Sequence, residues 1–384
     1  MISILVASLP MIASGTYCAI ERVQVPELRF GVSAETAPID PGFQWDEAIV
    51  SWNVEKSHNA RLKVEAKISD RWYVIAEWSG NLAMSSRRSV PDQKTEEAEV
   101  LTDILKVKDG ARQLILRLTL DKIRPEGDSP AIKRLAVCFS NSAAFSIGDA
   151  AGSGAKRAIP VPQEAQGPYE LGKLKYQPSD ASPEFEKWFK AVKGAQYCSP
   201  TCVSMILRFW AKELNRPELN IQVPTVVPNV FDEKYPGTGN WSFNTAYMGS
   251  FPGMISYVTR LTSISDLEAV VDAGIPVVCS VSHNLVLGNG KPAGGDGHLV
   301  IVVGFDDNGD VIANDPGISA KVRRTYKRSD FMKGWNTSKR TVYICHPESI
   351  KLPSLAERSL LVRQSVLRFF GPTSLLKTAR TCET

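Results

Sequence analysis

The stretch Gly-Ala-Gln-Tyr-Cys-Ser-Pro-Thr-Cys-Val-Ser-Met-Ile-Leu-Arg-Phe-Trp, residues 194–210, predicts the start of a helix that organises the second half of the chain. Ser199 is a favourable N-cap and Pro200 suits the first helical position. Apolar residues then recur at helical spacing and predict one buried face: Cys202, Ile206, Phe209 and Trp210. Cys198 lies just before the first turn, where unpaired N–H groups and the helix dipole favour an anion. A thiol held there ionises readily and is a candidate nucleophile, and burial under the helix is the alternative.

The length and the net charge of the chain restrict the class of protein to which it can belong. The chain has 384 residues, which predicts two or three domains. Its net charge of +4 is small for this length and spread along the sequence. Because no basic patch is interleaved with aromatic residues, we expect no nucleic-acid partner.

The cysteine and histidine content argues against disulfides and metals. Seven cysteines are scattered along the chain, an odd number that does not suit a disulfide framework. There is no Cys-x-x-Cys pair and there are only four histidines, so a zinc site is not expected. We predict neither a metal ion nor another cofactor.

The two ends of the chain differ in character. Residues 1–21 contain an apolar run, 2–16, that has neither a basic segment before it nor an Ala-x-Ala site after it. A signal peptide and a first strand are therefore both open interpretations, and a secreted or cell-envelope location is as compatible with them as a cytoplasmic one. Residues 351–384 form a basic amphipathic tail, which we expect to cap the second domain rather than to contact a membrane or a partner.

Residues 22–146 predict an antiparallel β-sandwich. Apolar and polar residues alternate in runs separated by polar turns: 48–54, 61–68, 71–78, 113–120 and 132–139. Trp72, Tyr73 and Trp78 are candidates for a carbohydrate- or cell-surface-binding face. The alternative, which we favour, is that alternate members of this set fill the core.

A linker and a hairpin define the second domain. Residues 147–158 are small and flexible and separate the β-sandwich from a domain spanning 159–350. Within it, residues 299–305 form a nearly continuous apolar run, a turn follows, and a return strand ends near Asp315. His298 opens the first arm, so the two side chains can approach across the ladder. A histidine oriented by a carboxylate is one interpretation, and a structural pair is the other.

A Cys before a helix, a His on a strand and an Asp on the next strand follow the chain order of papain-type enzymes, in which thiolate and imidazolium activate each other. The second domain resembles the bacteriocin-processing peptidase-like family of bacterial cysteine peptidases, within the papain-like clan. Five motifs carry the resemblance: residues 198–207, 239–247, 273–278, 297–305 and 314–316. The resemblance implies an α+β chain in which the β-sandwich precedes a papain-like domain, with a helix packed on an antiparallel sheet.

The resemblance also implies roles for individual residues. Cys198 is the expected nucleophile, His298 the general base and Asp315 the orienting carboxylate. The glutamine of the oxyanion hole is expected upstream of the cysteine, and Gln166 fits this position after a Val-Pro segment. Gln196 is the other candidate, although it is very close to the cysteine along the chain.

The predicted activity is hydrolysis of a peptide or amide bond in a peptide or protein substrate through an acyl-thioester. Two alternatives are a papain-like shell that binds peptides without cleaving them, and acyl transfer by a transglutaminase or deamidase. Leader-peptide processors of the family join this domain to membrane spans and an ATPase, neither of which is present in this sequence. Cleavage after a double-glycine leader is therefore not expected. His283 and His346 have no carboxylate at a recognisable spacing, and we expect them to be structural.

Overall fold

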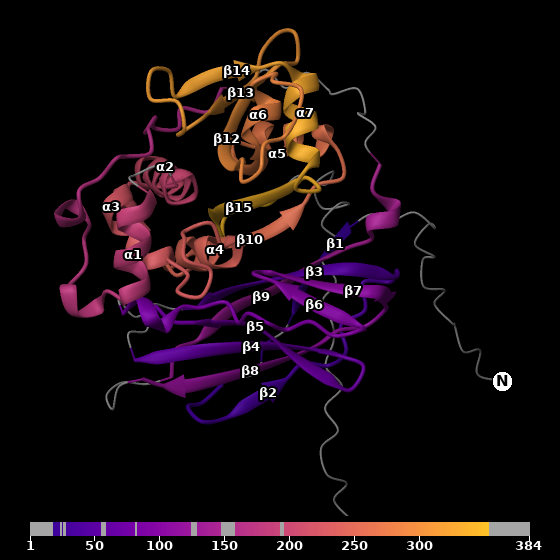
Figure 1. The fold of residues 1–384 in the computed structure, drawn as a ribbon. Helices are drawn as coiled ribbons and strands as arrows, with labels where there is room; N and C mark the ends of the chain where they lie inside the picture. The colour runs from indigo at the N-terminus through magenta and orange to yellow at the C-terminus, as the bar shows by residue number, and fades with distance from the viewer. Residues whose placement is uncertain are drawn as a thin grey trace, which may run out of the picture.

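A computed structural model of the chain describes residues 18–23, 25, 28–54, 59–80, 83–123, 129–146, 158–192 and 196–352. The expectations for residues 2–16, for the linker up to residue 157 and for the tail beyond residue 352 concern segments outside these ranges. Figure 1 shows a lower β-domain and an upper domain of helices around a sheet. The prediction of an α+β chain with an antiparallel β-domain first is confirmed.

The first domain consists of two antiparallel sheets that share one core. The first sheet has the order β1-β9-β3-β7-β6, with bounds Cys18–Val23, Ile132–Ser140, Trp45–Val54, Ile104–Ala111 and Ala98–Leu101. The second has the order β2-β8-β4-β5, with bounds Ser33–Glu35, Ile115–Lys122, Ala60–Ile68 and Arg71–Trp78. The alternation of apolar and polar residues therefore located the five strands β3, β4, β5, β8 and β9 closely, whereas it did not predict β1, β2, β6 and β7. Trp45 and Trp52 are fully buried between the sheets.

The three aromatic residues considered for surface binding do not form an exposed row. Tyr73 and Trp78 are buried in the core of the β-domain, as the favoured alternative predicted. Trp72 is half-buried, and the Arg117 guanidinium lies over its ring at 4.1 Å from the centroid. These residues therefore give no support for a carbohydrate- or cell-surface contact.

The second domain is built on a six-stranded sheet of order β10-β15-β11-β12-β13-β14. Its strands are Met254–Arg260, Thr341–Pro347, Val277–Ser282, Gly297–Phe305, Val311–Asn314 and Arg323–Tyr326. Its helices, α1 to α7, are Pro183–Val192, Cys198–Glu213, Val223–Val230, Trp241–Gly249, Ile264–Asp272, His283–Val286 and Arg328–Asn336. Helix α2 packs on β12 and β15, and α5 packs on β11 and β12; Figure 1 shows the two helices on opposite sides of the sheet. Strand β12 is buried almost throughout, which explains its nearly continuous apolar sequence.

Strand β3 belongs to both domains because its two faces point to different cores. Its even-numbered residues from 48 to 54 face the second sheet of the β-domain. Its odd-numbered residues face the second domain, where Ile49 joins the core and Ser51 Oγ accepts a hydrogen bond from Val258 N at 2.9 Å. Asn53 continues this face and exchanges hydrogen bonds with the backbone of Ser256. Alternation thus gives a strand that is buried on both sides.

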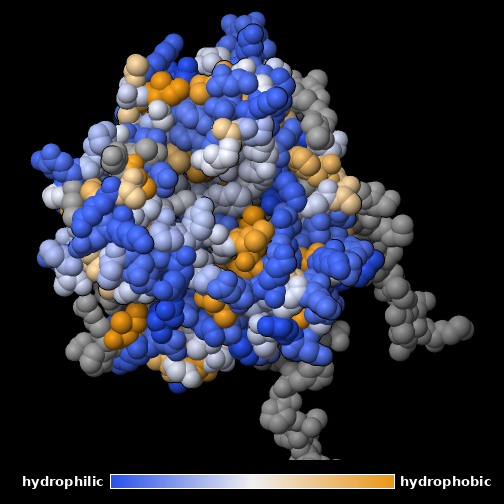
Figure 2. Space-filling model, in the orientation of Figure 1, coloured by the Kyte–Doolittle hydropathy of each residue, from blue (hydrophilic) through white to orange (hydrophobic). Residues whose placement is uncertain are grey.

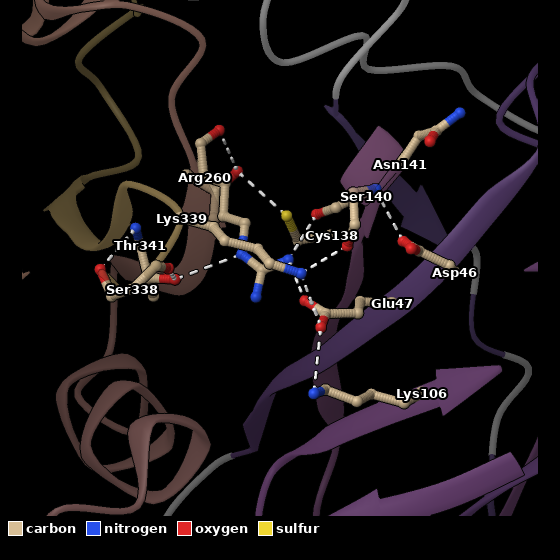
Figure 3. Close-up of polar contacts among 12 residues, drawn as sticks. Asp46, Glu47, Lys106, Cys138, Ser140, Asn141, Arg260, Ser338, Lys339 and Thr341 are labelled. Carbon is tan, nitrogen blue, oxygen red and sulfur yellow. Dashed lines mark hydrogen bonds and ion pairs between the residues drawn. The ribbon is translucent and has the colours of Figure 1, made fainter. Parts of the chain in front are cut away.

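An ion cluster completes the junction between the domains (Figure 3). The Glu47 carboxylate of β3 lies 2.6 Å from Arg260 Nη1 and 2.8 Å from Lys339 Nζ, both from the second domain. Burial raises the pKa of Glu47, but these two cations outweigh it and lower the pKa overall. Arg260 Nη1 also donates to Ser140 Oγ at 2.9 Å, so it bonds to two strands of the β-domain. The domains are therefore joined by apolar packing, by hydrogen bonds between side chains and backbone, and by buried charge.

The exterior offers little apolar surface on the face in view. In Figure 2 apolar residues form small separate patches, and one lies near the centre, at the level where the two domains meet. Among the residues that the structure describes, no helix is long and apolar enough to cross a membrane.

Candidate active site

Cys198 is the first residue of α2 and follows the N-cap residue Tyr197. The helix therefore begins one residue before Ser199, which we had expected to be the cap. Ser199 is buried instead, with its hydroxyl 3.1 Å from the Tyr343 hydroxyl of β15, and it lies within the first turn. The shift keeps Cys198 at the helix N-terminus, where the free N–H groups favour a thiolate.

The surroundings of the Cys198 thiol favour its ionised form. Burial raises the pKa of this thiol, but a hydrogen bond with His298 and the charge of that ring lower it. The backbone N–H groups of Leu299 and Ser199 also lower this pKa. The pKa of Cys198 is lowered overall, whereas burial raises the pKa of the other described cysteines: Cys18, Cys138, Cys202, Cys279 and Cys345.

His298 and Asp315 meet at the open end of the β12–β13 hairpin, as their spacing predicted. His298 is the second residue of β12 and Asp315 directly follows β13. His298 Nε2 lies 2.7 Å from Asp315 Oδ1, which leaves Nδ1 as the ring nitrogen for the Cys198 thiol. Burial lowers the pKa of His298, but the hydrogen bonds with Asp315 and Cys198 raise it to about 10. The structure thus brings together a thiol, an imidazole and a carboxylate.

The Asp315 carboxylate has a donor for each of its lone-pair positions. Oδ1 accepts from Gly317 N at 2.8 Å as well as from His298. Oδ2 lies 3.1 Å from His283 Nε2 and accepts from the Tyr326 hydroxyl. Burial raises the pKa of Asp315, yet these hydrogen bonds and the His298 charge hold it far below its usual range. Asp315 is therefore a fixed anion beside His298.

His283 is the residue that sequence spacing missed. We expected it to have no paired carboxylate, but it contacts Asp315, and its ring stacks on that of His298 with centroids 4.2 Å apart. A usable signal was present, because His283 directly follows β11, and β11 pairs with β12 so that Val281 lies opposite His298. A histidine at the end of a neighbouring strand can reach the same carboxylate.

The same cluster has the composition of a metal site. Ligand atoms of His283, His298 and Asp315 all lie within 4.8 Å of one another. The Nε2 atoms of His283 and His298, however, are each within hydrogen-bond distance of an oxygen of Asp315. The Tyr326 hydroxyl and Gly317 N add two further donors to the carboxylate. Donors suit a lone carboxylate anion better than a carboxylate that binds a cation, so the geometry favours a hydrogen-bonded histidine–aspartate cluster.

Cys198 and His298 line a cleft of about 540 Å³. One wall comes from the second domain, and another comes from the turn between β6 and β7 of the first domain, residues 101–104. Gln196 also lines this cleft. Gln166 instead lies beside the segment that follows Asp315, where its backbone N–H donates to Pro316 O at 2.9 Å.

The Gln196 side chain is oriented by the aromatic cluster next to it. Trp188 Nε1 donates to Gln196 Oε1 at 3.4 Å, so the amide oxygen is engaged as an acceptor. The backbone oxygen of Gln196 accepts from Thr238 Oγ1 at 3.0 Å, which fixes the segment just before Cys198. The amide NH₂ of Gln196 is then a candidate donor within the cleft.

Chemically, the site can hold a thiolate–imidazolium pair. The thiolate is a strong nucleophile, the imidazolium can donate a proton to a leaving group, and Asp315 fixes the ring orientation. His346 lies outside this site, where it is buried and its ring nitrogen Nδ1 lies 2.9 Å from Pro347 O.

Comparison with known proteins points to one family. Residues 174–343 match the model of the Peptidase C39-like family, and residues 27–140 match that of a Peptidase C39 N-terminal domain. A crystal structure described as a C39-like peptidase from Bacillus anthracis aligns with 15% identity and a TM-score of 0.30, over 49% of this chain and 97% of that one. No curated protein matches the chain.

Proposed function

Because the chain belongs to the Peptidase C39-like family, we propose that it is a cysteine peptidase that hydrolyses a peptide or amide bond through an acyl-thioester on Cys198. The observation that carries the proposal is the 2.7 Å contact between His298 Nε2 and Asp315 Oδ1, with His298 and Cys198 lining one cleft. The lowered pKa of the thiol supports the role of Cys198 as nucleophile.

The proposed reaction has two steps. The Cys198 thiolate attacks the substrate carbonyl carbon, a C–S bond forms and the carbonyl oxygen becomes an oxyanion. The imidazolium of His298 then protonates the leaving amine as the C–N bond breaks. In the second step, neutral His298 takes a proton from water, the resulting hydroxide attacks the thioester, and the acid product leaves as the thiolate is restored.

An oxyanion in this cleft requires hydrogen-bond donors. Gln196 lines the cleft beside Cys198, and its oxygen is already engaged by Trp188, which supports its NH₂ as one donor. Gln166, the upstream candidate from the sequence, lies next to Pro316 and is the alternative. Gln196→Ala is expected to reduce hydrolysis about 10²–10³-fold, the usual cost of losing an oxyanion donor. Alkylation by iodoacetamide forms no oxyanion, so its rate is expected to be unchanged. A loss of this size in Gln166→Ala alone would assign the role to Gln166.

The nucleophile can be tested before any substrate is known. At pH 6, iodoacetamide is expected to label Cys198 first, because the pKa values of the other described cysteines are raised. Peptide mapping identifies the labelled residue, and Cys198→Ala provides the blank. Labelling spread evenly over several cysteines at pH 6 would contradict an activated thiol.

Turnover is tested with a mixture of peptides analysed by mass spectrometry. Peptides cleaved by the unsubstituted protein and left intact by Cys198→Ala would support hydrolysis. Incorporation of a small primary amine into glutamine side chains would instead assign the site to acyl transfer. Binding of peptides without cleavage or incorporation would contradict both and leave a peptide-binding shell.

A further inference from the structure

We propose that the β6–β7 turn of the first domain forms a subsite of the active-site cleft that binds an apolar side chain of the substrate. The proposal rests on the peptidase function and adds to it a contribution from the other domain. Residues 101–104 line the same cleft as Cys198 and His298, although almost a hundred positions separate the turn from the cysteine. The first domain is therefore part of the substrate site.

The wall carries an exposed large apolar side chain, Leu101, and such side chains are few among the described residues. Among the described residues, five large apolar side chains are exposed: Val32, Leu101, Ile123, Tyr235 and Leu287. Two of the five line the cleft, Leu101 at 43% exposure and Tyr235 at 54%. Leu101 comes from the first domain and Tyr235 from the second. Exposed apolar residues that gather at a cleft indicate a binding site more than scattered ones do.

The charges around the cleft favour an uncharged side chain. Among the described residues that line it, none is Lys, Arg or Glu. Asp103 is buried, and its Oδ2 accepts a hydrogen bond from Trp241 N at 2.6 Å, so this carboxylate is already engaged. A charged substrate side chain would lose water here without gaining an ion pair, whereas an aliphatic or aromatic one would bury apolar surface.

The wall is held in place before substrate arrives. The bond from Trp241 N to Asp103 ties the turn to the first residue of α4. The facing loop is fixed by Asp232, whose Oδ1 accepts from Tyr235 N at 3.2 Å and from Ser89 N of the first domain at 3.0 Å. Both sides of the subsite are thus attached across the domain junction. A preformed subsite of this kind can discriminate between substrates while the protein loses little conformational entropy on binding.

The test compares Leu101→Ser with Leu101→Met, which keeps the apolar contact, and with Val32→Ser, an exposed apolar residue outside the cleft. The probes are peptidyl chloromethyl ketones in which a leucine side chain is placed at each position in turn and compared with serine. Their second-order rates of reaction with Cys198 are measured, with iodoacetamide as a probe that has no side chain.

The proposal predicts that the unsubstituted protein prefers leucine to serine at one position. Leu101→Ser should lower that preference about tenfold, the usual worth of a small apolar contact, while Leu101→Met and Val32→Ser keep it. Iodoacetamide rates should stay equal in all variants. The subsite proposal would be overturned if Leu101→Ser preferred leucine to serine as strongly as Val32→Ser does. It would also be overturned if the unsubstituted protein showed no such preference. Failure of iodoacetamide to select Cys198 would instead overturn the peptidase function, so the two failures are distinguishable.

Discussion

Gly317→Ala should disable the site through one added methyl group. A Cβ at Gly317 would lie 2.9 Å from His298 Cε1, 3.1 Å from His298 Nε2 and 3.2 Å from Asp315 Oδ1. Ordinary contacts begin at 3.4 Å, so the ring must move by about half an ångström. Catalytic groups tolerate about 0.5 Å of misplacement, and 1 Å costs about 100-fold in rate, so hydrolysis should fall roughly tenfold to hundredfold. Gly317 has no positive φ that would add backbone strain, and this isolates the steric effect.

The assay is the pH dependence of iodoacetamide alkylation of Cys198, which requires no known substrate. Displacing His298 weakens its hydrogen bond with the thiol, so the pKa of Cys198 should rise and alkylation at pH 6 should slow. Gly294→Ala is the matched control, because a Cβ there meets nothing within 4 Å. Thermal unfolding checks that both variants are folded. If folded Gly317→Ala alkylates like Gly294→Ala over the whole pH range, the argument from close approach is refuted.

Three further predictions concern charged groups. Asp315→Asn removes the anion that raises the pKa of His298, so alkylation at pH 6 should fall at least about 100-fold, and an unchanged pH profile would contradict the role of this charge. Burial raises the pKa of Asp103 to about 7, above its unfolded value of about 4, so its ionisation destabilises the fold as pH rises between these values. Asp103→Asn should therefore raise Tm relative to the unsubstituted protein at pH 8 but not at pH 4, and an equal difference at both would refute this assignment. Glu47→Gln removes the buried partner of Arg260 and should cost about 3–5 kcal/mol of unfolding free energy in urea titrations, where a loss below about 1 kcal/mol would contradict it.

Local patterns predicted the elements of the site well. The helix that carries Cys198 and the hairpin that carries His298 and Asp315 follow from periodicity and turn residues, whereas the expected Ser199 cap is wrong because Tyr197 is the N-cap. The approach of His298 to Asp315 follows from strand pairing. These features depend on residues that are close in sequence or joined by one turn, and such relations are readable from a single chain.

Contacts between distant segments were not predictable in the same way. Alternation in β3 indicates a polar face, but it does not show whether Ser51 and Asn53 meet water or the backbone of another domain. His283 reaches Asp315 only because β11 and β13 are both neighbours of β12. The turn at Leu101 lines the cleft because the domains pack together, and no local spacing encodes that placement.

The double use of β3 has a consequence for how substrate is admitted. Ile20, Ile49 and Cys138 of the first domain are part of the main core of the second, so pulling the domains apart would expose that core to water. The two walls of the cleft come from different domains, so this shared core fixes the width of the cleft opening. If the proposed peptidase function holds, we expect a peptide to enter this cleft as an extended segment.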